Sequence, residues 1–121
     1  MKEYIKLSSD KKFGSVSVRF YISQDRVLAI GKKMQEINGQ AVMTGHNWEA
    51  FLNYYLDTNY PEVSAGMGSD PDHKNYVAYY KLTPDNEKKA EKLAQIIEDL
   101  VENESMIYET LKNHGDEIDW D

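Results

Sequence analysis

The chain has 121 residues, of which 40% are apolar and 12% aromatic, with 21 acidic and 14 basic side chains and no cysteine. A chain of this length is expected to form one domain around one core. The lack of cysteine excludes disulfides, thiolate metal sites and cysteine nucleophiles. The net charge of −7 argues against binding to nucleic acid, which requires a surplus of Lys and Arg on one face.

The amino-terminal region does not resemble a targeting segment. Residues 1–20 mix charged with apolar side chains and lack the continuous apolar run of a secretory signal. No stretch elsewhere is long and apolar enough to predict a membrane span. We therefore expect a protein that works in the cytoplasm and has no membrane partner.

Two strands and a helix are predicted first. Residues 4–7 and 15–22 follow the apolar-polar alternation of strands, and the polar, glycine-containing segment between them suits a hairpin loop. Over residues 24–38 the apolar side chains recur every three or four positions, which predicts a helix. Ser23 or Asp25 could cap its amino terminus.

The middle of the chain predicts one more helix and two more strands. The helix opens at Trp48 and ends at Pro61, because proline cannot continue a helix. Alternating apolar residues then predict strands at 63–67 and 76–82.

Two helices complete the predicted fold. Thr83 is expected to cap a long amphipathic helix, and Pro84 to occupy its first position. A shorter helix is predicted over residues 106–111. The order is strand, strand, helix, helix, repeated once. Short connections and one-sided strands favour an α+β domain, a single unit over residues 1–121 with an antiparallel sheet of about four strands covered by helices.

Negative charge is concentrated at the carboxy-terminal end of the sequence. Residues 1–82 carry nine acids and ten bases, whereas residues 83–121 carry twelve acids and four bases. The acids that we single out are Glu98, Asp99, Glu102, Glu104, Asp116, Glu117, Asp119 and Asp121. One interpretation is a solvated helix face followed by a frayed acidic tail at 116–121. The other is a docking surface for a basic partner. Complementary charge would then accelerate the association of the two proteins.

No constellation typical of an enzyme occurs in the sequence. The zinc motif H-E-x-x-H, the nucleophile motif G-x-S-x-G and the phosphate-binding G-K-[ST] are all missing. The remaining candidate is a loop in which Asp70, Asp72 and His73 could, together with His46, hold a divalent metal. Asp-Pro-Asp is also ordinary turn chemistry. A metal-binding or enzymatic domain would require these residues to converge in a pocket.

The chain is rich in aromatic residues, with nine tyrosines, two tryptophans and three phenylalanines. Tyrosine suits half-buried strand positions, where its hydroxyl can reach water. Tyrosine and tryptophan also anchor protein interfaces. We therefore regard Tyr54, Tyr80 and, within the acidic tail, Trp120 as candidate anchors for a protein partner.

The middle of the chain resembles a known family. A glycine, two variable residues and a tryptophan-acid pair open a helix at Gly45-His-Asn-Trp48-Glu49, and a Pro-Glu dipeptide follows at Pro61. Together with the two strands and the long helix after them, this pattern resembles immunity protein 51 of bacterial polymorphic toxin systems over residues 44–112. Gly45 and Trp48 are expected to serve the fold.

The resemblance implies a protein that binds and inactivates a cognate toxin and is not itself an enzyme. Toxins of this kind are frequently nucleases with basic clefts, so the acidic residues and exposed tyrosines would cover the surface that binds RNA or DNA. No cofactor is expected. The alternative, a small metal-binding or enzymatic α+β domain that uses the 70–73 loop, stays open at this point, and nothing in the sequence indicates an oligomeric state.

Overall fold

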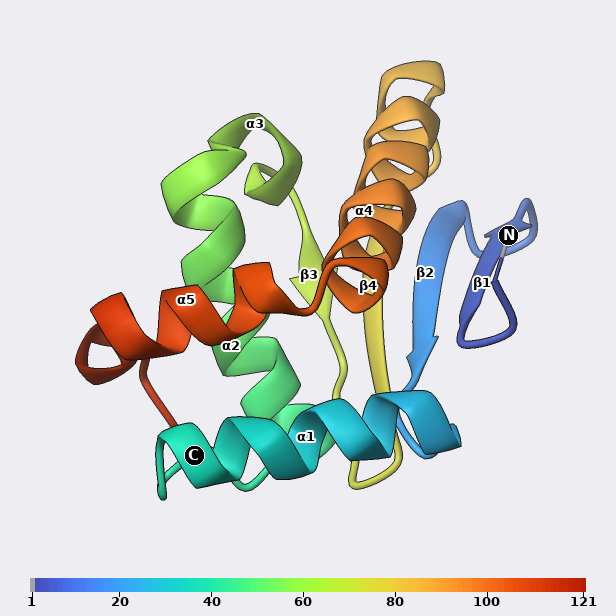
Figure 1. Ribbon diagram of the computed structural model, residues 1–121. Helices are drawn as coiled ribbons and strands as arrows, with labels where there is room; N and C mark the ends of the chain where they lie inside the picture. Colours follow the sequence, from blue (N-terminus) through green and yellow to red (C-terminus); the bar gives the residue numbers. More distant parts are fainter. Residues whose placement is uncertain (1) are drawn as a thin grey trace.

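A four-stranded antiparallel sheet forms the framework of the protein, whose computed structural model describes residues 2–121 (Figure 1). The strands are β1 (Ile5–Asp10), β2 (Ser15–Tyr21), β3 (Gly68–Ser69) and β4 (Asn75–Lys81). They lie in the order β1-β2-β4-β3, so β1 and the two-residue β3 are the edges. The predicted α+β class and antiparallel sheet are confirmed.

Five helices and one 3-10 turn accompany the sheet in the described part of the chain. They are α1 (Asp25–Ile37), α2 (Gly45–Asn59), α3 (Pro61–Ser64), α4 (Pro84–Glu102), α5 (Ser105–His114) and the turn η1 (Gly115–Glu117). α4 lies across the sheet and contacts β1, β2 and β4, whereas α2 packs against β4 and α1 packs against α5 (Figure 1). No helix within residues 2–121 has both the length and the hydropathy of a membrane span.

Only one face of the sheet is covered by helices. Alternate residues of β2 and β4 point into the core, and the buried set is Val16, Val18, Phe20, Tyr76, Ala78 and Tyr80. Their neighbours in each strand are half-buried or exposed. The period-two pattern in the sequence therefore identified the core side of β2 correctly, because a side chain on a strand must face either the core or the solvent.

The predicted strand at 63–67 is wrong. Val63 lies in the short helix α3, and the strand in this region is confined to residues 68–69. Proline fixes φ near the helical value and needs no donor in the first turn, so Pro61 starts a new helix as well as ending α2. Gly66, at a φ of +77°, then turns the chain toward β3.

The helix starts follow the capping residues only in part. Thr83 accepts a hydrogen bond from the backbone N–H of Asn86, which confirms it as the cap of α4. The expected cap of α1 by Ser23 or Asp25 is wrong, because its N-cap is Gln24, without a side-chain bond. α2 starts three residues before Trp48, since the hydroxyl of Thr44 caps it.

Candidate functional site

An acidic groove of about 520 Å³ runs between α2 and the carboxy-terminal segment of the protein. Its lining includes five acids and two large aromatic side chains, namely Glu49, Asp57, Glu117, Asp119, Asp121, Tyr54 and Trp120. No Lys or Arg is among the residues that line it. A concave surface that carries several carboxylates and has no Lys or Arg in its lining is suited to binding a positively charged partner.

The segment that forms one wall of this groove is held firmly. The backbone N–H of Asp121 donates to Oδ1 of Asn47 at 2.6 Å, and the indole Nε1–H of Trp120 donates to the carbonyl of Gly115 at 3.1 Å. Ile118 is buried, with 5% of its surface exposed. Residues 116–121 therefore pack against α2 and do not form the frayed tail that one interpretation of the sequence suggested.

Asn47 is the polar residue on which this packing depends. It is 3% exposed, and its Nδ2 donates to the carbonyl of Val42 at 2.7 Å while its Oδ1 accepts from Asp121. Its role was not predicted from the sequence. A signal was present, because Asn47 lies one and two turns before Phe51 and Tyr55 on the buried stripe of α2, and a buried polar residue usually has a specific partner.

The predicted toxin-binding acids lie in three different places. Glu117, Asp119 and Asp121 line the groove, together with Tyr54 and Trp120. Asp116 is exposed in η1 and lines a neighbouring hollow beside α5. The remaining candidates, Glu98, Asp99, Glu102 and Glu104, lie at the end of α4 and in the turn that follows it.

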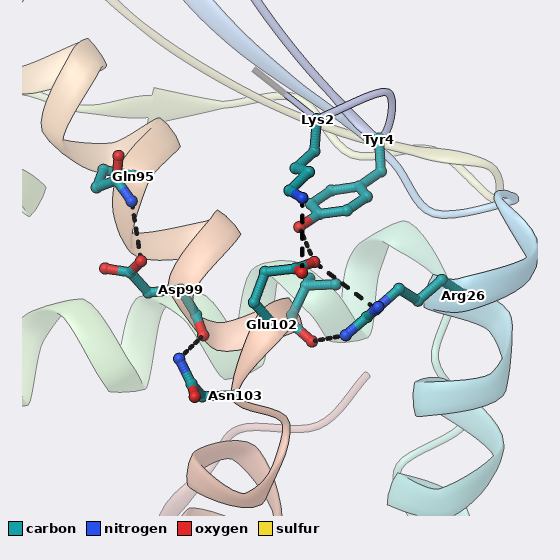
Figure 2. Close-up of polar contacts among 8 residues, drawn as sticks. Lys2, Tyr4, Arg26, Gln95, Asp99, Glu102 and Asn103 are labelled. Carbon is teal, nitrogen blue, oxygen red and sulfur yellow. Dashed lines mark hydrogen bonds and ion pairs between the residues drawn. The ribbon is translucent and has the colours of Figure 1, made fainter.

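Glu102 is engaged within the protein (Figure 2). Its carboxylate accepts a hydrogen bond from the Tyr4 hydroxyl at 2.8 Å and lies 3.7 Å from both Lys2 Nζ and Arg26 Nε. Arg26 also donates to the carbonyl of Val101 at 3.2 Å. The bond from Tyr4, with the charges of Arg26 and Lys2, lowers the pKa of Glu102, because each favours the ionised carboxylate.

Two of the neighbouring acids, Asp99 and Glu104, are also partnered. Gln95 Nε2 donates to the Asp99 carboxylate at 2.8 Å (Figure 2), and Lys33 Nζ lies 3.3 Å from Glu104. Two acids at the carboxy-terminal end of α4 and in the turn after it, Glu102 and Glu104, are thus paired with basic side chains of α1 and with Lys2. The carboxy-terminal excess of acids does not form one negative surface. The groove is the part whose described lining contains no Lys or Arg, and its Glu117 carboxylate lies 2.5 Å from Nδ1 of His114.

Tyr80 is not a surface residue, so its selection as an exposed anchor is wrong. Only 1% of its surface is exposed, and its hydroxyl donates to the carbonyl of Val63 at 2.6 Å. Burial raises the pKa of Tyr80 to about 12. The exposed tyrosine of β4 is Tyr79, 45% accessible, whose ring packs over Gly68 of β3.

The residues that carry the family resemblance have structural positions. A Cβ at Gly45 would overlap the carbonyl oxygens of Asp72 and Asn75, so only glycine allows the 70–75 loop to cross the start of α2. Trp48 is 2% exposed and meets the ring of Phe20 edge-on at 5.0 Å. Both residues lie where the fold requires them, as expected.

Glu49 connects the same motif to the sheet. Its carboxylate accepts a hydrogen bond from the hydroxyl of Ser69 on β3, and it also lines the groove. One acidic side chain therefore fixes a sheet edge to α2 and contributes charge to the candidate site.

The 70–73 loop does not assemble the alternative metal site. The Asp72 carboxylate accepts two hydrogen bonds, both of 2.8 Å, from the backbone N–H groups of residues 74–75, and these bonds lower its pKa. The rings of His46 and His73 lie 6.2 Å apart. Within residues 2–121, no group of three or more His, Asp or Glu side chains is placed to hold a metal ion.

The fold and the groove define a small α+β protein with an acidic groove walled by aromatic side chains. The chain belongs to the immunity protein 51 family, whose family model matches residues 6–116. No curated protein and no solved structure matches it significantly. The family resemblance seen in the sequence is confirmed over a longer stretch than 44–112. Membership supports a role as an immunity protein and implies binding to a cognate toxin.

Proposed function

We propose that this immunity protein neutralises its cognate toxin by docking the acidic groove onto a basic surface of the toxin domain, and that this domain is a nuclease of a polymorphic toxin system. The single observation that carries the proposal is the groove itself, in which five carboxylates and two aromatic side chains occur without a lining Lys or Arg. The interaction would take place in the cytoplasm, before the toxin reaches its substrate.

Charge and aromatic surface have different roles in this proposal. The groove carboxylates attract a basic surface over a distance comparable to the Debye length and so accelerate association. Tyr54 and Trp120 supply large, rigid contact areas, and their ring faces attract Arg and Lys side chains. Since Asn47 already holds the carboxy-terminal segment in place, little ordering entropy has to be lost on binding.

The same arrangement explains why a nuclease is the favoured target. A nuclease binds the phosphate backbone with clustered Lys and Arg side chains. An inhibitor that presents carboxylates in a groove competes for those cations directly and needs no chemistry of its own. We therefore propose inhibition by occupation of the toxin surface, with neither catalysis nor a cofactor on the part of the immunity protein.

The test compares two double charge reversals of equal size. Asp57→Lys with Asp119→Lys alters the groove, whereas Glu98→Lys with Asp99→Lys alters the α4 end. The partner is the toxin domain encoded beside the gene, and association rates are measured at low and high salt. We expect the groove variant to associate at least about tenfold more slowly, with a weaker salt dependence, and the α4 variant to resemble the wild type. Equal behaviour of the two variants would reject the groove as the docking surface.

A second experiment isolates the aromatic contribution. Trp120→Ala removes a wall of the groove, and Tyr79→Ala removes an exposed ring of similar size from the opposite side of the sheet. A central aromatic anchor is worth about 2 kcal/mol, so the first change should accelerate dissociation of the complex by roughly 30-fold. Tyr79→Ala should leave the dissociation rate unchanged. If the two substitutions had the same effect, Trp120 would not be an anchor.

A further inference from the structure

One edge of the sheet ends in a strand with an unpaired side. Within residues 2–121, β1 pairs only with β2, and no other element lies beyond it (Figure 1). Tyr21 N–H donates to the carbonyl of Tyr4 at 2.8 Å, which makes these two residues a hydrogen-bonded pair. Hydrogen-bonded pairs alternate along an antiparallel ladder, so Lys6, Ser8 and Asp10 also bond toward β2.

It follows that Leu7 and Ser9 direct their backbone N–H and C=O groups outward, to the free edge. Within residues 2–121 these two residues have no other backbone partner. β1 contains no proline, and its register with β2 is continuous from residue 5 to residue 10. These are the features that allow an edge strand to accept another strand.

The sequence of β1 is complementary to itself in one antiparallel register. If two copies pair about Ser8, then Leu7 of each copy lies opposite Ser9 of the other, and Lys6 lies opposite Asp10. The outward backbone N–H and C=O groups of Leu7 in one copy then bond to those of Ser9 in the other. These are the residues whose backbone groups the β1–β2 ladder leaves unused, so the register is compatible with that ladder. On the open face of the sheet, each Lys6 meets an Asp10 of opposite charge, a favourable cross-strand pair.

Neither charged residue is already neutralised. No ion pair of Lys6 or Asp10 occurs among the described residues. Asp10 uses one carboxylate oxygen to accept from the N–H groups of Lys12 and Phe13, at 3.0 and 3.2 Å. Its other oxygen is therefore available to an incoming lysine. Asp10 thus supports the hairpin and remains suited to a charge pair across the edge.

The hairpin beside this edge carries the most exposed large apolar side chain among the described residues. Phe13 has 77% of its surface accessible. In the register about Ser8 the charged pairs end at Lys6 and Asp10, so the hairpin turn at residues 11–14 of one copy begins next to the start of β1 in the other. This brings the turn that carries Phe13 close to the second copy. The contact would cover apolar surface that the single chain leaves in water.

We propose that two copies of this chain associate through β1 in the antiparallel register centred on Ser8, which joins their sheets into one continuous sheet of eight strands. The contact has two-fold symmetry, so it closes and does not propagate into a fibre. β1 lies on the other side of the molecule from α2 and the carboxy terminus (Figure 1), the two segments that line the acidic groove. Both grooves of the pair stay accessible, and the inference is independent of the proposed toxin binding.

The first test blocks the edge without disturbing the fold. Ser9→Pro removes an N–H that faces outward and leaves the bonds to β2 intact, whereas Ser9→Ala keeps the N–H and serves as the control. The full chain is analysed by sedimentation velocity from micromolar to millimolar concentration. We expect the wild type and Ser9→Ala to double in mass with concentration and Ser9→Pro to remain a monomer. A wild type that is monomeric throughout, or a dimer that survives Ser9→Pro, overturns the proposal.

The second test checks the register by complementation. Lys6→Glu places two acids opposite each other at both ends of the contact, and Asp10→Lys places two lysines there. Each variant alone should dimerise about tenfold more weakly than the wild type. A mixture restores both opposite-charge pairs and should form the heterodimer in preference to either homodimer. A mixture with no such preference overturns the register. Melting temperatures verify that each variant is folded.

A strand of the toxin is the competing occupant of this edge, and toxin binding distinguishes it. If Ser9→Pro abolished binding to the toxin domain while the wild type remained monomeric, β1 would receive a toxin strand and the second-copy proposal would be wrong. If the groove variants did not affect toxin binding, the proposed function would fail, but the proposal that two copies dimerise through β1 would still stand. The two proposals can therefore fail separately.

Discussion

Asn47 offers a direct test of how the carboxy-terminal segment is held against α2. Asn47→Ala removes the donor to Val42 O and the acceptor for Asp121 N–H, bonds of 2.7 and 2.6 Å. Each hydrogen bond of this kind contributes about 1 kcal/mol net. We expect the free energy of unfolding to fall by about 2 kcal/mol and the melting temperature by about 8 °C.

The measurement combines urea unfolding with the indole N–H signals in the NMR spectrum. Trp120 should respond most, because release of the segment frees its Nε1–H from the carbonyl of Gly115. Asn53→Ala is the matched control, since Asn53 lies on the exposed side of the same helix. Its stability should stay within about 0.5 kcal/mol of the wild type.

A conservative variant separates the two bonds. Asn47→Asp keeps an acceptor for Asp121 but loses the donor to Val42 and places a carboxylate against that carbonyl. We expect it to be at least as destabilised as the alanine variant, with a Trp120 signal closer to that of the wild type. If Asn47→Ala matched Asn53→Ala in stability and in the indole spectrum, the buried amide would not hold the segment.

Three further predictions concern the fold and its pH dependence. Gly45→Ala should destabilise the protein by about 2 kcal/mol in chemical unfolding, because its methyl group overlaps the carbonyls of Asp72 and Asn75; an unchanged stability would show that the loop can move aside. Trp48→Ala should cost about 4 kcal/mol by creating a cavity, and a loss under 1 kcal/mol would contradict the packing described. The pKa of Glu102 in the folded protein lies below its ordinary value of 4.5. The stability that its ionised carboxylate contributes is therefore present above pH 4.5 and is lost as the pH falls through the folded-state pKa. Glu102→Gln should therefore flatten the decline of stability below about pH 4.5 in unfolding series, and identical slopes would reject this linkage.

Local patterns in the sequence sufficed wherever one interaction dominated. The alternation in β2 follows from a sheet that is covered on one face, and Thr83-Pro84 determines the start of α4 because cap and proline act within one turn. Residues 63–67 had no such dominant pattern. Their alternation of apolar residues suits a strand. Pro61, however, favours the first turn of a helix, and this turn, α3, includes Val63.

The site was harder to predict because it depends on contacts between distant segments. Asn47 and Asp121 are separated by 74 positions, so neither residue indicates the other in the sequence. Tyr79 and Tyr80 present the same difficulty in another form. The pattern of β4 shows that the two rings face opposite sides, but which side is the core depends on where α2 and α4 pack, and this burial removes Tyr80 from the surface.

The distribution of acids shows why charge counted along a sequence differs from charge on a surface. α4 delivers Glu102 to a place where Lys2 and Arg26, from the first quarter of the chain, lie within 3.7 Å. The carboxy-terminal segment instead runs back along α2 and meets Glu49 and Asp57, which belong to the nearly neutral part of the sequence. The groove therefore collects its charge from two segments, and only one of them is acidic in sequence. A basic partner that is attracted by the net charge of −7 would find in this groove five carboxylates on one concave surface, with no Lys or Arg in its lining.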